Sequence, residues 1–281
     1  MGKPVVIQDA RLPGASASPG ALRGAGTAGS PRPHITVRGL SKRFASAQIY
    51  DNFDLDIPKH KIVSVFGPNG CGKSTLINMI AGLVPIDAGE ILFDGKSLKD
   101  TKIGYVFQNY REAMFPWMRT IDNIAYPLKL EGRSKAQVDR RMEELVASFD
   151  VKFDLKRYPY ELSGGQQQTA SIMRALAPEP EVLFLDEPFS ALDFEMTLFI
   201  REKLQEVFMQ TGTTMLLVSH DLEEAVYLAD QVLLLTKRPT RVAEILPYGD
   251  ARPRTVETLS EPGFVATKKR SLEIFQREVR R

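Results

Sequence analysis

Residues Gly67–Ser74 read Gly-Pro-Asn-Gly-Cys-Gly-Lys-Ser, which satisfies the pattern G-x-x-x-x-G-K-[ST] at every fixed position. The apolar run Ile62–Phe66 directly precedes the pattern, and the helix-forming segment Lys73–Gly82 follows it. Glycines let the backbone turn tightly, so that successive N–H groups and the start of the helix present positive partial charge at one point. This order of strand, loop and helix is the context in which the pattern binds a nucleoside triphosphate.

Within this loop the pattern assigns particular phosphate contacts. Lys73 is expected to reach the β- and γ-phosphates, and the hydroxyl of Ser74 is expected to hold Mg²⁺. The expected cofactors are therefore ATP and Mg²⁺. The full set of predicted ATP-binding loop residues is Gly67, Pro68, Asn69, Gly70, Cys71, Gly72, Lys73, Ser74 and Thr75.

Composition limits the other functions that the chain could serve. The hydrophobic content of 43% over 281 residues is ample for a buried core. The balance of 37 basic against 35 acidic residues gives no electrostatic reason to bind nucleic acid. No apolar stretch approaches the roughly 20 residues that span a bilayer. We therefore expect a chain that stays in the cytosol, and its one cysteine, Cys71, cannot form an internal disulfide.

The chain divides into three parts by pattern. Residues 1–33 are dominated by Gly, Ala, Pro and Ser and contain no aromatic residue, which predicts a disordered tail. Residues 34–250 carry dense alternation of apolar runs and are expected to form one nucleotide-binding domain. Residues 251–281 form a C-terminal tail with a helix from about Val265.

Several short apolar runs in the central part predict strands, and helical segments separate a number of them, which favours parallel pairing with crossovers. The alternating segment Phe53–Ile57 predicts a half-buried strand. The other runs are Ile35–Val37, Ile62–Phe66, Ile103–Phe107, Val182–Leu185, Met215–Val218 and Val232–Leu235.

No comparable strand pattern occurs between Gln108 and Leu162. There, apolar residues recur at helical spacing, which places them on one face of a helix. These residues are Val138, Met142, Leu145, Val146 and Phe149. The pattern predicts a helical subdomain at about residues 109–162, inserted in the nucleotide-binding core.

A second constellation makes the assignment specific. Leu162–Gln166 reads Leu-Ser-Gly-Gly-Gln, and the strand Val182–Leu185 ends in Asp186-Glu187. Gln108 after a strand, Ser190–Asp193, and His220 after another strand complete the set. Together these six motifs, in this order over about residues 35–240, resemble the nucleotide-binding subunit of ATP-binding cassette (ABC) transporters.

The resemblance implies a fold and a partner. The implied fold is α/β: a P-loop NTPase core with a mainly parallel sheet, an antiparallel β subdomain and an inserted helical subdomain. In that family the signature sequence of one subunit completes the ATP site of a second subunit in a head-to-tail homodimer. The residues implied to contact ATP across the dimer are Ser163, Gly164, Gly165 and Gln166.

The resemblance also assigns catalytic roles. Asp186 is expected to support the Mg²⁺ shell and Glu187 to be the general base that polarises water. His220 is expected to steady the γ-phosphate, and Gln108 to contact Mg²⁺ and water. The expected metal set is thus Ser74, Gln108 and Asp186. Two other histidines, His34 and His60, have no such context, and we expect both to be solvated.

Two residues near the loop have two interpretations each. Phe44 occupies the position where the family stacks an aromatic ring on adenine, but ordinary core packing also explains it. Cys71 lies close to a helix N-terminus, which can lower a thiol pKa and make the thiol reactive, so that thiol reagents block activity and MgATP protects. The alternative is that cysteine is simply small enough for the loop.

The signature helix departs from the family pattern at two positions. Thr169 stands where a basic residue is common, so that an ion pair is expected to be missing. Met173 stands where alanine is preferred. Because neither position touches phosphate, Mg²⁺ or water, we expect turnover to be tuned rather than abolished.

The segment Met114–Thr120 points to transport. A Pro-Trp pair, Pro116-Trp117, resembles importers of nitrate, sulfonates and taurine. Phe115 and Trp117 are expected to line a groove for a separate membrane permease, with an external solute-binding protein as an indirect partner and the cytoplasmic face of the membrane as the location. Burial of both rings in the subdomain's own core is the alternative.

The C-terminal helix is expected to pack its apolar face, with Leu272, Phe275 and Val279, on its own domain. Its basic residues leave membrane binding as an alternative. They are Lys268, Lys269, Arg270, Arg277 and Arg280. For the whole chain, the alternatives to an importer ATPase are the ATPase of a two-component exporter and a soluble, non-transport ABC ATPase.

Overall fold

The computed structural model describes residues 33–45 and 47–280, which lie in one compact unit, Pro31–Arg281. The expected disordered tail lies outside the described residues except for Pro33, which begins the first strand. No helix of this described part is both long and apolar enough to cross a membrane.

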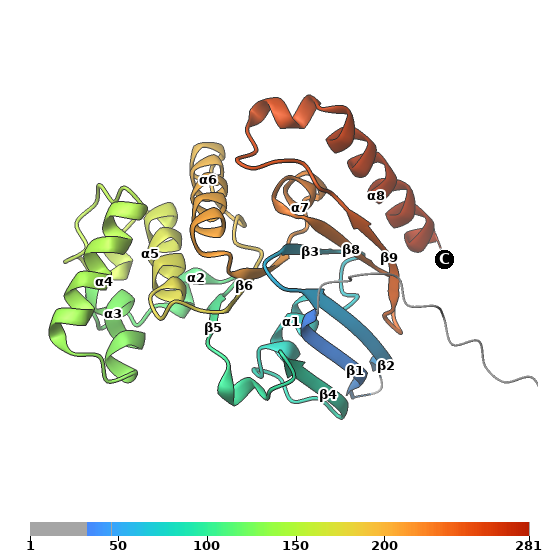
Figure 1. The fold of residues 1–281 in the computed structure, drawn as a ribbon, viewed down its shortest axis with the longest axis horizontal. Coiled ribbons are helices and arrows are strands. Elements are labelled where there is room, and N and C mark those ends of the chain that lie inside the picture. Colours follow the sequence, from blue (N-terminus) through green and yellow to red (C-terminus); the bar gives the residue numbers. More distant parts are fainter. Residues whose placement is uncertain (1–32, 46, 281) are drawn as a thin grey trace, which may run out of the picture. The chain divides into compact units, whose positions relative to one another are not determined.

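A six-stranded sheet forms the centre of the molecule, in the order β5-β6-β7-β3-β8-β9 (Figure 1). Its first five strands run parallel, and β9 is antiparallel to β8. The strands are β3 (Ile62–Phe66), β5 (Ile103–Val106), β6 (Val182–Asp186), β7 (Thr214–Val218), β8 (Gln231–Leu235) and β9 (Val242–Pro247). Every residue of β3, β6 and β7 is buried, which explains why these strands read as continuous apolar runs.

A separate antiparallel sheet has the order β2-β1-β4. Its strands are β1 (Pro33–Phe44), β2 (Ala47–Pro58) and β4 (Ala88–Phe93). Helix α1 (Lys73–Ile80) fills the space between the two sheets, because its apolar residues pack with both of them in one core cluster (Figure 1). The expected fold class, α/β with a mainly parallel sheet and an antiparallel sheet, is confirmed. The sequence patterns did not predict strands β4 and β9, since one residue of β4 and none of β9 is buried and both strands lack a clear apolar run.

Helices without strands follow β5, as the sequence indicates. They are α2 (Tyr110–Ala113), α3 (Thr120–Leu130) and α4 (Lys135–Ser148), with the 3₁₀ turn η2 (Pro159–Glu161) before α5 (Gly164–Leu176). Figure 1 shows α3, α4 and α5 gathered on one side of the large sheet. Val138, Met142, Leu145 and Phe149 are buried in the main core, while Val146 packs against it.

The remaining helices cover the large sheet. They are α6 (Phe194–Thr211), α7 (Leu222–Leu228) and α8 (Pro262–Arg280), with short 3₁₀ turns η1 (Leu98–Asp100) and η3 (Val256–Ser260). Helix α8 packs on its own domain, as expected, and Phe275 contacts Phe66 with 5.2 Å between ring centroids. The expected face is wrong in part: Leu272 and Val279 are exposed, whereas Phe264 and Ile274 are buried.

The expectation that His34 is solvated is also wrong, because the side chain is only 1% exposed. Strand β1 begins two residues before its apolar run, Ile35–Val37, and Pro33 pairs with Pro58. The imidazole is thereby held against the start of β7, where its Nδ1 lies 2.7 Å from Oγ1 of Thr214. His60 is exposed, as expected, and its Nδ1 lies 2.6 Å from the carbonyl oxygen of Gly212.

Candidate functional site

The glycine-rich loop lies at the carboxyl end of β3, between that strand and α1. Gly72 precedes the helix with φ 117°, and a Cβ there would lie 2.7 Å from Cγ2 of Ile49. Only glycine fits this combination of left-handed backbone and close approach. No side chain caps the start of α1, so its first N–H groups are free to meet a ligand.

Lys73 holds the loop closed. Its side chain is buried, and Nζ donates to the carbonyl oxygens of Gly67 at 3.0 Å and Pro68 at 3.3 Å. Carbonyl oxygens are weak partners for an ammonium group compared with phosphate. The Lys73 ammonium group therefore lies in the loop, and phosphate oxygens could replace the two carbonyl oxygens as its hydrogen-bond acceptors. Thr75, two residues further along α1, is half-buried.

Two carboxylates stand at the carboxyl end of β6, beside the loop. Asp186 is buried, and its Oδ1 accepts from the hydroxyl of Ser74 at 2.9 Å. Burial raises the pKa of Asp186, although the Ser74 hydrogen bond opposes that shift. A buried carboxylate next to a serine hydroxyl, with no cation in contact among the described residues, fits a divalent cation such as Mg²⁺.

Glu187 is the second carboxylate, and its backbone has φ 47°. Its Oε2 accepts from Nε2 of Gln108 at 2.8 Å and lies 3.3 Å from Nδ1 of His220. Glu187, Gln108 and His220 come from the ends of three different parallel strands. The topology thus brings together five residues that the sequence singled out separately: Ser74, Gln108, Asp186, Glu187 and His220.

The signature residues form the start of α5. Among the described residues, they make no hydrogen bond with the loop residues. Ser163 and Gln166 make a reciprocal capping box, in which each side chain accepts from the other residue's backbone N–H. A Cβ on Gly164 would lie 2.7 Å from the Tyr110 hydroxyl. The two glycines are therefore needed for packing as well as for an open helix end.

The departures from the family pattern are accommodated within α5. Thr169 is buried, and its Oγ1 donates to the carbonyl oxygen of Gly165 at 2.9 Å, so its hydroxyl has a partner. Met173 is fully buried in the main core.

Phe44 ends β1 and is 47% exposed, which is incompatible with ordinary core packing. Nζ of Lys42 lies 5.1 Å from its ring centroid. The ring belongs to the small antiparallel sheet and makes no ring contact with the loop within the described residues. It is available for stacking with a planar group.

The reactive-thiol hypothesis for Cys71 is wrong. The side chain is buried, and burial raises the pKa of this thiol despite the opposing effect of Lys73. The Cys71 side chain packs in the core between the two sheets, away from the solvent that a thiol reagent needs. Cysteine is here a small apolar residue, which is the alternative that the sequence left open.

The sequence interpretation missed groups that contact the loop from other elements. A pocket of about 450 Å³ is lined by Pro68–Cys71 together with Lys237 and Arg238, which lie on the loop after β8. The hydroxyl of Tyr50 donates to the carbonyl oxygen of Gly72 at 3.0 Å. Lys237 and Arg238 could have been found in the sequence, because they are two adjacent basic residues that follow a buried strand.

A second pocket, of about 610 Å³, lies on the other side of the carboxylates and is lined by Asn78, Tyr105, Gln108 and Asp186 among others. Tyr105 donates to Oδ1 of Asn78 at 2.6 Å and lies 3.5 Å from Oδ2 of Asp186. Burial and the neighbouring carboxylate raise the pKa of Tyr105, so the phenol keeps its proton beside Asp186.

Comparison with known proteins places this site in a family. The ABC transporter family profile matches residues 50–190. The taurine import ATP-binding protein TauB of Escherichia coli is 39% identical over 83% of this chain and 94% of its own length. The sulfate/thiosulfate import ATP-binding protein CysA of Neisseria meningitidis is 42% identical over 72% of this chain. This chain spans 58% of the length of that CysA.

A solved structure agrees with the sequence relatives. It is a dimeric, post-hydrolysis ATP-binding cassette bound to ADP and Pi, with 27% identity and a TM-score of 0.68. The match covers 77% of this chain and all of that one. On the profile, the relatives and the fold together, the chain belongs to the ATP-binding family of ABC transporters.

Proposed function

We propose that the protein hydrolyses ATP and that this hydrolysis drives import of a small solute through a separate membrane permease. The observation that carries the proposal is the arrangement at Glu187, whose carboxylate contacts Gln108 at 2.8 Å and His220 at 3.3 Å. The Ser74–Asp186 pair lies directly beside it. A base, its two positioning partners and a cation-binding pair thus occur at one end of the sheet.

Each residue has a proposed action. Lys73 exchanges the carbonyl oxygens of Gly67 and Pro68 for the β- and γ-phosphates. Ser74, Asp186 and Gln108 hold Mg²⁺, which neutralises charge on the phosphates when bound. Glu187 accepts a proton from the attacking water, and Phe44 stacks on adenine.

His220 has a positional role in this scheme. Its Nδ1 faces Glu187, and its side chain is more than half exposed at the mouth of the site. Such a ring can hold the carboxylate in place on one side and reach the γ-phosphate on the other. The role of His220 is therefore to orient the groups that react.

Hydrolysis is proposed to require a second copy of the chain. Ser163 is exposed at the start of α5 and, with Gly164, Gly165 and Gln166, offers a helix N-terminus. Among the described residues, this end makes no hydrogen bond with the glycine-rich loop of its own chain. In a head-to-tail homodimer this end closes the γ-phosphate of the partner. The dimeric cassette found among solved structures supports this arrangement.

The permease contact is proposed at the aromatic segment before α3. Trp117 is 72% exposed, so its burial in the subdomain core is excluded. Phe115 is half-buried beneath it, with 5.5 Å between ring centroids. Exposed aromatic side chains on a rigid base are typical interface anchors. We place the chain at the cytoplasmic face of the membrane on this basis.

The solute class is proposed from relatives alone. TauB is named as a taurine importer and covers nearly the same length as this chain, which supports a taurine-, sulfonate- or nitrate-like anion. The permease and an external binding protein select the solute. Co-purification from native membranes tests transport: a multi-span permease supports it, whereas ribosomal proteins or no partner support a soluble ABC ATPase.

The catalytic part is tested with Glu187→Gln. We expect ATP hydrolysis to fall by roughly 10²–10⁴-fold, because a positioned base contributes that much. ATP affinity should remain near the wild-type value, since Lys73 and the loop are intact. The matched control is Glu90→Gln, an exposed carboxylate on β4. Hydrolysis within threefold of wild type in Glu187→Gln contradicts the assigned base.

A further inference from the structure

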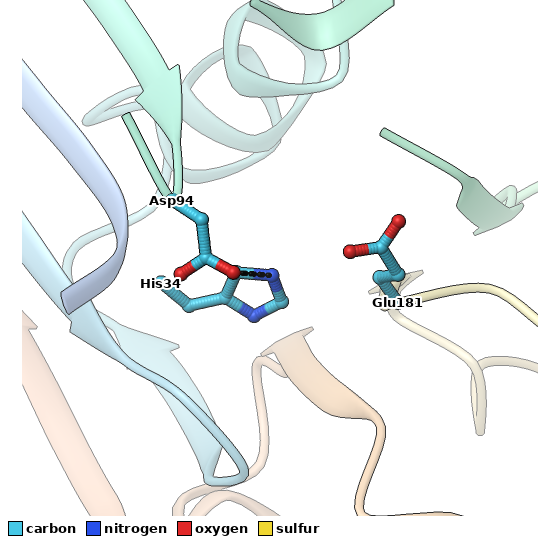
Figure 2. Close-up of side chains that lie close together, drawn as sticks. All are labelled: His34, Asp94 and Glu181. Atoms are coloured by element: carbon cyan, nitrogen blue, oxygen red, sulfur yellow. Dashed lines mark ion pairs between the residues drawn. The ribbon is translucent and has the colours of Figure 1, made fainter. Parts of the chain in front are cut away.

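A polar cluster lies at the opposite end of the large sheet from the nucleotide site. His34 at the start of β1, Asp94 after β4 and Glu181 before β6 bring one ligand atom each within 4.8 Å of the others. Figure 2 shows the His34 ring between the two carboxylates. These residues are 60 and 87 positions apart along the chain, so only the fold brings them together.

One nitrogen of the imidazole has no hydrogen-bond partner among the described residues. Nε2 of His34 is buried and makes no hydrogen bond, and Oδ2 of Asp94 lies 3.9 Å away. Only 1% of the surface of His34 is exposed. An unpaired polar atom at such a place costs free energy unless a ligand or water reaches it. Nε2 points to the space between the two carboxylates (Figure 2).

The other ring nitrogen has a fixed partner. Nδ1 lies 2.7 Å from Oγ1 of Thr214, and that oxygen accepts from the backbone N–H of His60 at 2.9 Å. A hydroxyl has two acceptor lone pairs, so Thr214 can accept from both groups in the tautomer that has its proton on Nδ1. Metal binding requires this tautomer, because Nε2 then carries the lone pair. This is the arrangement by which outer partners orient a metal-binding histidine.

The cluster borders a pocket of about 620 Å³, which is lined by His34, Lys59, Glu179 and Glu181 among others. An ion in this pocket therefore has a path to His34 and Glu181. Glu181 is exposed, and the Asp94 side chain is partly exposed, so both carboxylates can rotate. Such rotation is needed, because zinc bonds of about 2.0–2.2 Å require closer ligand atoms than 4.8 Å.

We propose that His34, Asp94 and Glu181 bind a divalent transition-metal ion of the Zn²⁺ class, which ties the antiparallel sheet to the start of β6. One imidazole nitrogen and two carboxylate oxygens are ligands that zinc accepts, and the pocket supplies water for the remaining position. The site is separate from the nucleotide site and does not depend on ATP hydrolysis.

One cation already competes for this site. Nζ of Lys59, on the turn between β2 and β3, forms an ion pair with Oδ2 of Asp94. This pairing also lowers the pKa of Asp94, so the carboxylate is charged at neutral pH. A metal ion must displace the ammonium group. Lys59 is partly exposed and can withdraw into solvent.

The experiment uses the full chain, freed of metal with a chelator and without nucleotide. Zn²⁺ is titrated against a chromophoric chelator, and Co²⁺ absorbance reports the coordination. We expect one Zn²⁺ per chain in the wild type. Glu181→Gln should weaken binding by at least roughly tenfold, and this exposed residue can change without loss of the fold, which a change at buried His34 risks.

Matched variants make the result specific. Glu179→Gln removes an exposed carboxylate from the same pocket and should leave Zn²⁺ affinity unchanged, because Glu179 is outside the three-residue group. Lys59→Gln should tighten Zn²⁺ binding by removing the competing cation. His220→Ala reports any Zn²⁺ held by the nucleotide-site carboxylates instead.

Two results overturn the proposal. One is that His220→Ala abolishes all Zn²⁺ binding, so that no bound Zn²⁺ is left to assign to His34, Asp94 and Glu181. The other is equal affinity in Glu181→Gln and Glu179→Gln. A lower Zn²⁺ affinity in Glu181→Gln together with a higher Zn²⁺ affinity in Lys59→Gln supports the site. The affinity of a nonspecific surface ion is not expected to follow both changes.

Discussion

The helices α1 and α5 both begin at glycine-rich turns, but their N-termini differ. Gly72 caps α1 without any side-chain hydrogen bond, and the loop before it carries Lys73 and faces Asp186 and Glu187. Ser163 caps α5, and its hydroxyl accepts from the Gln166 N–H at 3.4 Å. The first helix end is open and surrounded by the groups of one site, whereas the second has its own weak cap.

The difference teaches what each end can do alone. In the proposed site, the phosphate contacts, the cation-binding pair and the base at the end of α1 all come from one chain. The end of α5 supplies N–H groups and one hydroxyl, and its long capping bond can be exchanged for a stronger acceptor. The proposal of a shared site in a homodimer follows from this inequality.

The largest effect is expected when the α1 end and the α5 end are each inactivated in a different variant. Lys73→Ala and Ser163→Arg should each lower ATP hydrolysis by at least about a hundredfold, because the first removes a positive charge from the phosphate and the second blocks the α5 N–H groups with a bulky side chain. When the two variants are mixed, heterodimers contain one site with an intact Lys73 and an intact Ser163. Hydrolysis should therefore return on mixing, and the phosphate-release rate of the mixture measures it.

This complementation separates two arrangements of the site. If both ends served the same ATP within one chain, neither variant would hold an intact site, and mixing would restore nothing. A mixture of Lys73→Ala with Glu187→Gln is the matched control, since both changes lie on the α1 side. It should remain inactive.

A smaller effect is expected from packing beneath the α5 end. A Cβ on Gly165 would lie 2.6 Å from Cγ of Met196. We expect Gly165→Ala to lower the free energy of unfolding by about 1–3 kcal/mol, as overpacking does. Urea denaturation measures this. Gly249→Ala, where nothing lies within 4 Å of the added carbon, should be neutral, and equal losses in both variants would contradict the steric account.

On the α1 side, a change at Asp186 should stabilise the protein. Burial raises the pKa of Asp186 above the ordinary 3.8, so the folded state holds the proton more tightly than the unfolded state. The stability that this preference contributes is present below the unfolded pKa and is lost as pH rises. Asp186→Asn should therefore raise Tm at pH 7 by a few degrees.

The readout for Asp186→Asn is thermal unfolding without nucleotide, with and without Mg²⁺. The gain over wild type should shrink as the pH falls through the raised pKa of the folded state toward the ordinary 3.8, because the wild-type carboxyl is then protonated. Mg²⁺-dependent ATP binding should fall in the same variant. A lower Tm at pH 7 would show that the Ser74 hydrogen bond outweighs the cost of burying the charge.

The sequence predicts the α1 side of this comparison well because its signals are local. The loop, its strand and its helix are contiguous, and a fully buried strand such as β6 reads as an apolar run that ends in Asp186-Glu187. The meeting of Gln108, Glu187 and His220 follows from parallel strand order, since carboxyl ends share one edge of the sheet.

What the sequence does not show depends on contacts between distant segments. His34 is polar and has no local context, yet the register of β1 buries it against Thr214. Lys237 and Arg238 reach the loop from a segment about 170 residues away. Strand β4 is exposed over half its length and is held by pairing with β1, which no apolar period reveals.

The smallest effect is expected at Cys71. Because burial raises its pKa above the ordinary 9.0, the folded protein keeps the thiol protonated at a pH where the unfolded chain ionises. The stability that this preference contributes is present below the unfolded pKa and is lost as pH rises through the folded pKa. Cys71→Ala should remove part of the fall in unfolding free energy above pH 9.

Urea denaturation of both proteins at pH 7.5 and pH 9.5 measures the effect, and the difference between the two proteins reports it. Burial and, next, the Cys71 thiol raise the pKa of Tyr50, so the difference between the two proteins also includes the coupling of Tyr50 to Cys71. At pH 7.5 a thiol reagent should react with Cys71 in the folded wild type far more slowly than in the urea-unfolded chain. Equal rates would mean that the loop opens readily, and the loop conformation that Lys73 holds closed would then be only one of several.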